Sequence, residues 1–258
     1  MSDAFVRTGE LKDLRSYPQW AQAIIEDCAP AKRRVLEHPI WAMMREGTLP
    51  DAAMRMFILS AWQVIEQFPQ YMAMSLLKAR YGTERGPHLA RRWLVRNIRV
   101  EQNHADYWLD WAEAVGVPRR DVLSNAATPE SGILAHWCWH ACDSDTLAAG
   151  MLTTNYAVEG ITGEWAVLVT LDDIYAYGFD ARIRPRAMRW LKLHAEYDDT
   201  HPWEALEIVS TLVGRDPAPE TVDHLRQCVL NTYVYKYLAL QHCMQATASA
   251  GSVRAVAA

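Results

Sequence analysis

The segment WLKLHAEYDDTHPW at residues 190–203 restricts what this chain can fold into more than any other. If it is a helix, His194, Asp198 and His201 occupy positions i, i+4 and i+7, which share one helical face. Two imidazoles and a carboxylate along one face are typical metal ligands. We therefore expect this face to point into the interior of a fold whose other elements complete a metal site.

Pro202 interrupts this pattern. A proline lacks the backbone N–H that would bond the carbonyl four residues earlier, so it bends or ends a helix. Two geometries remain open. The helix either continues with a kink, or a second helix begins at Pro202 with Asp199 or Thr200 near its N-cap. In the second case the sequence does not determine where His201 lies relative to His194.

The remainder of the chain also has a helical pattern. Apolar residues recur at helical spacing, prolines and glycines separate the segments, and alternating strand patterns are scarce. We expect an all-α protein: one bundle of about seven helices over residues 1–245, followed by a frayed Ala-rich tail at 246–258. The seven long helices are expected at about 31–44, 51–80, 87–115, 129–142, 144–175, 185–213 and 219–245, with short ones at about 21–28 and 119–123.

Three further acids and a histidine extend the set of ligands. Glu101 and His104 form an ExxH motif, whose spacing puts both side chains on one helical face. Glu159 is an acid within an apolar stretch, where burial is costly unless the carboxylate is paired or bound to a metal. Glu66 also follows an apolar run, and it is either a ligand, an acid that supports one, or an exposed residue.

The charge of this set indicates two metal ions. Its carboxylates are Glu66, Glu101, Glu159 and Asp198, and its histidines are His104, His194 and His201. Two divalent ions balance four carboxylates, whereas one ion or none leaves uncompensated acids in a core. Oxygen and imidazole ligands without a thiolate favour iron or manganese over structural zinc.

Each of these histidines alone is more often a hydrogen-bonded core residue than a ligand. It is the combination of the three motifs that favours a metal centre. His136 and His140 also have ligand spacing, but no acid accompanies them, so we interpret them as packing or supporting residues.

Composition excludes several classes of protein. The net charge of -5, without a Lys/Arg cluster, excludes a nucleic-acid partner. The absence of a signal core and of a long apolar run predicts a cytoplasmic protein without a membrane span. Five cysteines without a CxxC motif predict reduced, buried thiols. Eleven tryptophans, many near the expected ligands, predict an aromatic shell around an internal site.

The ligand motifs and their flanks resemble those of the haem-oxygenase-like di-iron oxidases. Within that superfamily they are most similar to the UndA group of medium-chain fatty-acid decarboxylases, which form 1-undecene. The similarity extends from residue 16 to about residue 244. It is carried by RVEQNHADYW at 99–108, TNYAVEGITGEW at 154–165 and WLKLHAEYDDTHPWEALE at 190–207.

The resemblance implies a seven-helix bundle without haem that binds two Fe(II) ions. It implies one iron held by Glu101, His104 and His194 and a second held by Glu159, Asp198 and His201. It also implies molecular oxygen as co-substrate, an external electron donor and a medium-chain fatty acid such as dodecanoate in an apolar tunnel. Loss of a β-hydrogen and of carbon dioxide would then yield the terminal alkene.

Two other functions remain open. One is a related di-iron oxidase or lyase that acts on an amino-acid-like substrate. Such a substrate would need a charged residue deep in the pocket, and the apolar segments near the ligands show no obvious Arg or Lys. The other is a non-catalytic ligand-binding or regulatory bundle, against which the metal ligands argue. A homodimer is one of the oligomeric states that the sequence allows.

Overall fold

The computed structural model describes residues 13–82, 84–124, 128, 130–197 and 200–255. Within this part of the chain every regular element is a helix, so the expected all-α class is confirmed. Fourteen α-helices occur here instead of about seven, because several expected helices are divided at junctions that the apolar pattern does not mark.

The longer helices form the frame of the bundle. They are α1 (Gln19–Leu36), α3 (Asp51–Lys78), α4 (Arg85–Glu101), α5 (His104–Ala114), α7 (Ile133–Ser144), α9 (Glu159–Thr170), α13 (His201–Val213) and α14 (Pro219–Ala255). The shorter helices are α2 (Pro39–Arg45), α6 (Arg119–Leu123), α8 (Leu147–Met151), α10 (Ile174–Tyr177), α11 (Arg184–Ala187) and α12 (Arg189–Tyr197). Two 3-10 turns, η1 (Leu14–Ser16) and η3 (Leu171–Asp173), and a π-helix, η2 (Leu152–Val158), complete the described elements.

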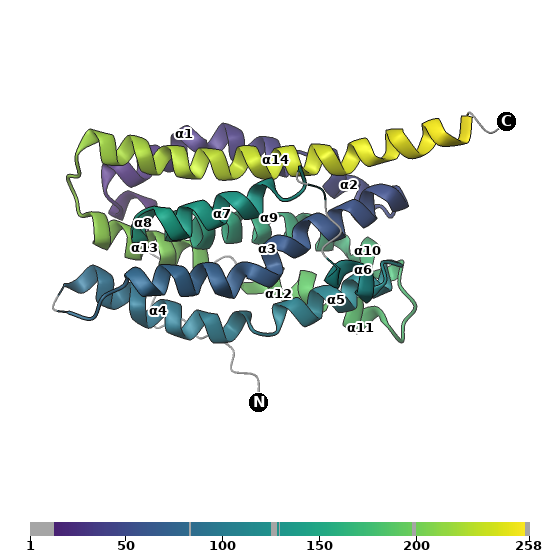
Figure 1. Cartoon of the computed structure of the whole chain (residues 1–258), viewed down its shortest axis with the longest axis horizontal. Helices are drawn as coiled ribbons and strands as arrows, with labels where there is room; N and C mark the ends of the chain where they lie inside the picture. Colours follow the sequence, from purple (N-terminus) through teal and green to yellow (C-terminus); the bar gives the residue numbers. More distant parts are fainter. Residues whose placement is uncertain (1–12, 83, 125–127, 129, 198–199, 256–258) are drawn as a thin grey trace.

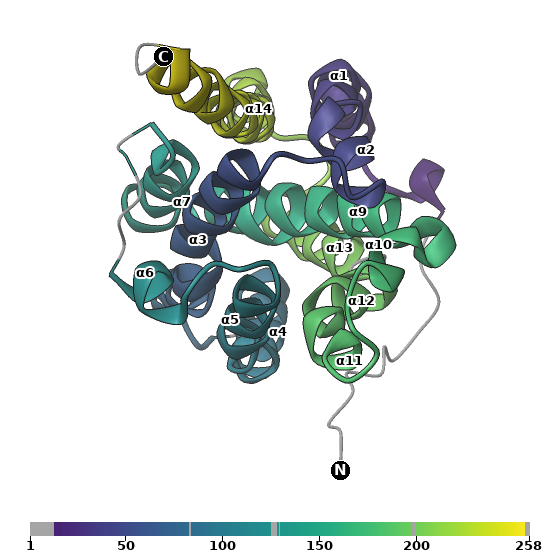
Figure 2. The same cartoon turned by 90° about the vertical axis from the view of Figure 1, so that its right-hand side faces the viewer.

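The bundle is organised around one central segment, made of η2 and α9. Helices α1, α3, α4, α7 and α14 run along the long axis of the molecule (Figure 1). Seen along that axis, α9 lies in the middle of the other helices (Figure 2). It packs against α12 and α2, while η2 packs against α13 and α14. Polar side chains of this segment are therefore held in the interior.

The expected 144–175 helix is interrupted after Thr170, where Asp172 and Asp173 have positive φ of 68° and 53°. Before that point the backbone stays helical from α8 to α9, with the π-helix η2 between them.

All residues of η2 are buried, and the Thr154 hydroxyl donates to the carbonyl of Gly150 at 2.9 Å. Such bonding back to the preceding turn competes with the regular backbone ladder. The wider π turn ends directly before Glu159, and π-helices are frequent at functional sites.

Stacked tryptophans join the central segment to its neighbours. Trp165 of α9 stacks on Trp41 of α2 with ring centroids 4.6 Å apart, and on Trp190 of α12 at 5.4 Å. All three are buried. Aromatic pairs of this kind contribute about 0.5–1.5 kcal/mol each beyond the area that they bury. The expected aromatic shell is thus present, and it fixes α12 against α9.

The break between the first two helices lies before Pro39, whereas the sequence pattern predicts it at Pro30. Pro30 lies inside α1, which continues to Leu36, although the sequence pattern predicts a break there. The division falls instead before Pro39, where His38 is extended and caps α2 by accepting from the N–H of Ile40 at 3.3 Å. A residue that precedes proline is disfavoured in helical conformation, which accounts for this junction.

The helix expected over 185–213 is also divided, and this decides between the two geometries at Pro202. Helix α12 ends at Tyr197, and α13 begins at His201 with Thr200 before it and Pro202 in its first turn. His194 and His201 therefore belong to different helices. Asp198 lies outside the described residues.

The C-terminal helix is longer than expected. Helix α14 extends to Ala255, past the predicted end at Gln245, because alanine has a high helix propensity. Fraying of this end stays a prediction. All five cysteines are buried and free, as the sequence predicts. In the described part of the chain no helix has the length and apolar character needed to cross a membrane.

Helices α4 and α13 approach closely at Gly86, and this contact gives a test of the packing. A Cβ atom there would lie 2.9 Å from the Cα of Leu212, so the backbones would have to separate. We expect Gly86→Ala to lower the free energy of unfolding by about 1–3 kcal/mol. Thermal unfolding measures the change, and a melting temperature equal to that of the wild type would contradict the close contact. Gly82→Ala, which meets no atom within 4 Å, is the matched control.

Candidate metal centre

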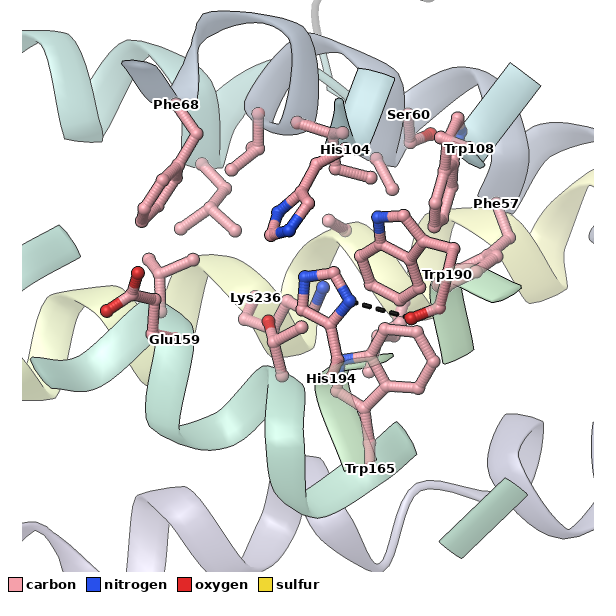
Figure 3. Close-up of a pocket in the computed structure, with 18 of the residues that line it drawn as sticks. Phe57, Ser60, Phe68, His104, Trp108, Glu159, Trp165, Trp190, His194 and Lys236 are labelled. Carbon is pink, nitrogen blue, oxygen red and sulfur yellow. Dashed lines mark hydrogen bonds between the residues drawn. The ribbon is translucent and has the colours of Figure 1, made fainter. Parts of the chain in front are cut away.

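A cavity lies in the interior of the bundle, between α3, α7, α9, α12 and α14. The cavity and its open mouth together amount to about 800 Å³. Its walls are mostly aliphatic and aromatic and include Phe57, Val64, Ile65, Phe68, Leu134, Trp165, Trp190 and Leu240. Its acidic and basic side chains are Glu101, His104, Glu159, His194 and Lys236, and Figure 3 labels the last four. The structure thus brings four of the predicted ligands to one cavity.

Glu101 and His104 meet at a helix junction. Glu101 ends α4 and His104 begins α5, and Gln102 between them keeps a helical conformation. Both side chains are buried, and Nδ1 of His104 lies 2.6 Å from Oε2 of Glu101. The other ring nitrogen, Nε2 of His104, is buried and has no hydrogen-bond partner in the described part of the chain. Leaving such a nitrogen unpaired costs about 1–3 kcal/mol, which a bound metal ion would offset.

His194 is held by Trp190, one turn earlier on α12. Its Nδ1 lies 2.8 Å from the Trp190 carbonyl, and its ring stacks on the indole with centroids 3.7 Å apart. A carbonyl can only accept, so Nδ1 carries the proton and Nε2 keeps a lone pair for a metal. The rings of His104 and His194 lie 4.7 Å apart, across the same space (Figure 3).

Electrostatics keep His194 in the form that binds metals. Burial, together with the neighbouring His104 and His201, lowers the pKa of His194 well below its ordinary value of 6.5. The imidazole is therefore neutral at pH 7, and neutral imidazole is the form that coordinates metal ions.

Of the three ligands predicted for the second iron, Glu159 and His201 lie in the part of the chain that the structure describes. Glu159 begins α9 directly after the π-helix, and its buried side chain faces the cavity (Figure 3). His201 begins α13 and is buried, with its ring 6.1 Å from that of Trp93. It is not among the residues that line the cavity, although it is close enough to affect the pKa of His194.

The structure does not bring Glu66 to the other predicted ligands. Its side chain is exposed on α3, whereas the adjacent Ile65 lines the cavity. Successive residues of a helix point about 100° apart, so an acid next to a buried residue can face solvent. His136 and His140, interpreted from the sequence as packing residues, are exposed on α7.

Lys236 is the ionisable residue of the cavity that the sequence analysis missed. It contradicts the expectation that no Lys or Arg lies near the ligands. It belongs to α14, far from the ligand motifs in sequence. One signal was available: Lys236 lies at helical spacing between Thr232 and Leu240, both of which are buried.

Among the described residues, one group of three has its potential ligand atoms within 4.8 Å of one another: Asp145, His224 and Cys228, outside the cavity. The described cavity residues form no group this tight. This cluster is explained without a metal. Nε2 of His224 and Oδ2 of Asp145 are hydrogen-bonded at 2.6 Å. Burial and the nearby Asp145 raise the pKa of the Cys228 thiol to about 12, which disfavours the thiolate that a metal requires.

The described residues of the cavity fit an iron centre. Two imidazoles and two buried carboxylates, without a thiolate, are the donor set that non-haem iron prefers. A metal would also satisfy the buried Nε2 of His104 and compensate the charge of Glu101 and Glu159.

Residues 55–233, more than half of the chain, match the family described as iron-containing redox enzymes. The chain belongs to this family. A TenA homologue from Pseudomonas syringae pv. tomato is 50% identical with a TM-score of 0.89, over 94% of this chain and 100% of that chain. A 4-aminobenzoate synthase from Chlamydia pneumoniae is 26% identical over 204 residues, which are 78% of this chain and 86% of the relative.

More distant structures support the fold alone. A domain with a heme oxygenase-like fold from Shewanella denitrificans has a TM-score of 0.69 at 16% identity, covering 92% of this chain and 94% of that chain. The bundle is therefore a haem-oxygenase-like fold, as expected from the resemblance of the motifs.

Substitution of individual histidines tests the metal centre. We expect His194→Ala to lower iron affinity by roughly 10–100-fold or more, because a ligand nitrogen is lost. His201→Ala should remove mainly the second ion, taking iron from about two per chain toward about one. Elemental analysis after loading with Fe(II) measures both. The exposed His136→Ala is the matched control, and unchanged stoichiometry in His201→Ala would refute its assignment.

Proposed function

We propose that this chain is an iron- and oxygen-dependent oxidase that decarboxylates medium-chain fatty acids to terminal alkenes. The shape and chemistry of the cavity carry the proposal. Aliphatic and aromatic walls enclose a space that also contains two imidazoles, two carboxylates and an ammonium. An amphiphilic acid needs this combination of a long apolar surface with a few convergent polar groups. Membership of a family of iron-containing redox enzymes supports the redox chemistry.

Six residues would hold the iron, and all but Asp198 belong to the part of the chain that the structure describes. Glu101, His104 and His194 would bind one ion, and Glu159, His201 and Asp198 the other. Bound ferrous iron supplies the oxygen activation and the charge that balances the buried carboxylates.

The chain's own residues position the acid. Each CH₂ of the alkyl tail that leaves water gains about 0.8 kcal/mol, so the apolar wall at Val64, Phe68 and Leu134 favours longer acids over short ones. Trp108, Trp165 and Trp190 also line the cavity and keep water from the ligand nitrogens. Trp190 holds the ring of His194 in one orientation, by a hydrogen bond from Nδ1 and by stacking.

The electron balance requires a reductant. The acid loses a β-hydrogen and its carboxyl group as carbon dioxide, which is a two-electron oxidation. Reduction of molecular oxygen to water takes four electrons. An external electron donor therefore supplies the other two, in agreement with the partner that the sequence resemblance implies.

A second candidate is the formation of an aromatic amine. Three Chlamydia relatives at 23–26% identity are named 4-aminobenzoate synthase. A polar or amino-acid-like substrate needs a charged residue in the pocket, and Lys236 is such a residue. A non-catalytic role fits less well, since the family is described as redox enzymes.

A product assay separates these candidates. Protein loaded with Fe(II) without oxygen, then given dodecanoate, oxygen and a reductant, should release 1-undecene into the headspace, detectable by gas chromatography. His194→Ala should reduce this product by about 100-fold or more, because a ligand of the reacting metal is lost, whereas His136→Ala should retain it. Iron-loaded protein that forms no alkene would contradict the proposal. Formation of 4-aminobenzoate in a parallel reaction would favour the second candidate.

A further inference from the structure

Lys236 is a buried cation that lines the candidate active-site cavity. Only 9% of the residue is exposed, and it borders the same cavity as His194 and Glu159 (Figure 3). Its Nζ lies 5.7 Å from the ring centroid of Trp165 and 6.0 Å from that of Phe57. Among the described residues its ammonium forms no ion pair or hydrogen bond.

The protein around Lys236 compensates its charge only in part. The two aromatic faces attract the ammonium, but this attraction is weaker than the hydration that burial removes. A thiolate at Cys243 or Cys138 would attract the Lys236 ammonium, but both thiols are neutral. Burial raises the pKa of Cys243 to about 11 and that of Cys138 well above 9. Burial lowers the pKa of Lys236 to about 8, so the amine is still mostly protonated at pH 7.

The carboxylates of the cavity do not provide the missing partner. Glu101 lies 2.6 Å from His104, and neither Glu101 nor Glu159 pairs with Lys236 in the described structure. Both acids belong to the proposed ligand set, so bound iron would compensate them. Two divalent ions carry four positive charges against the three carboxylates of the proposed ligand set, so the cavity with its ions would hold excess positive charge in addition to the ammonium. An anionic ligand in the cavity would complete the charge balance.

We propose that Lys236 binds the carboxylate of the substrate and so selects acids over other apolar molecules of the same length. This inference rests on the proposed function and deepens it. Lysine presents a single point charge, in contrast to the bidentate fork of arginine. It can pair with one carboxylate oxygen and leave the other free to face the metal ligands. An alcohol would leave the ammonium unpaired, because a hydroxyl carries no negative charge.

Ligand binding without turnover tests this role. Isothermal titration calorimetry at pH 7 compares decanoate with 1-decanol on full-length protein that holds Fe(II) in the absence of oxygen. We expect the wild type to prefer decanoate. Lys236→Met, which keeps the apolar stem, should weaken decanoate binding by about tenfold or more and change 1-decanol binding by less than about twofold. Lys236→Arg keeps the charge and should recover part of the decanoate affinity.

Controls separate a binding role from a structural one. Lys32→Met removes a lysine that pairs with Glu164 outside the cavity, and should change neither affinity. Iron content and melting temperature of each variant verify that the centre and the fold persist. Equal weakening of both ligands in Lys236→Met, or unchanged decanoate binding, would overturn the proposal.

The binding experiment on Lys236 and the decarboxylase assay can each fail without the other. If binding depends on Lys236 but no alkene forms, the carboxylate site stands and the proposed reaction fails. If alkene forms and Lys236→Met leaves the KM for dodecanoate unchanged, the reaction stands and the role of Lys236 fails. Where both hold, the variant should raise KM by a larger factor than it lowers kcat.

Discussion

The contact between Trp190 and His194 is the interaction on which the arrangement of the centre depends. The indole stacks on the imidazole, and the backbone carbonyl of the same tryptophan determines which ring nitrogen is free. Trp190 in turn stacks on Trp165, which belongs to the central helix that begins with Glu159. One run of aromatic contacts therefore connects the helices that carry the candidate ligands His194 and Glu159. Because interiors pack as densely as organic crystals, neither helix can slide without breaking the stack.

The tightly packed helices α9 and α12 border an interior cavity that carries several charged groups. The cavity holds two acids and an ammonium at a depth where isolated charges are strongly disfavoured. Iron would balance the acids, and the carboxylate of a substrate would balance Lys236. The proposed iron and the proposed acid would therefore offset charges of opposite sign in one cavity.

Much of this could be predicted from the sequence, because a buried ionisable residue stands out in an apolar helix. Glu101, His104 and His194 were selected by the helical spacing of their motifs and Glu159 as an acid in an apolar stretch, and the structure brings all four to one cavity. The same reasoning selected Glu66, which the structure places on the exposed side of α3. An acid at the border of an apolar face cannot be assigned to either side until the neighbouring helices are in place.

The sequence by itself determined the all-α class and the likeness to haem-oxygenase-like enzymes, and it predicted the candidate ligand residues, since these follow from local spacing and residue chemistry. Only the tertiary structure decided three further points. The chain is divided between α12 and α13, the π-helix precedes Glu159, and Lys236 reaches the cavity from α14. The physical reason is common to all three. Each depends on which helix packs against which, and helical periodicity describes the face of a helix without naming the partner that covers it.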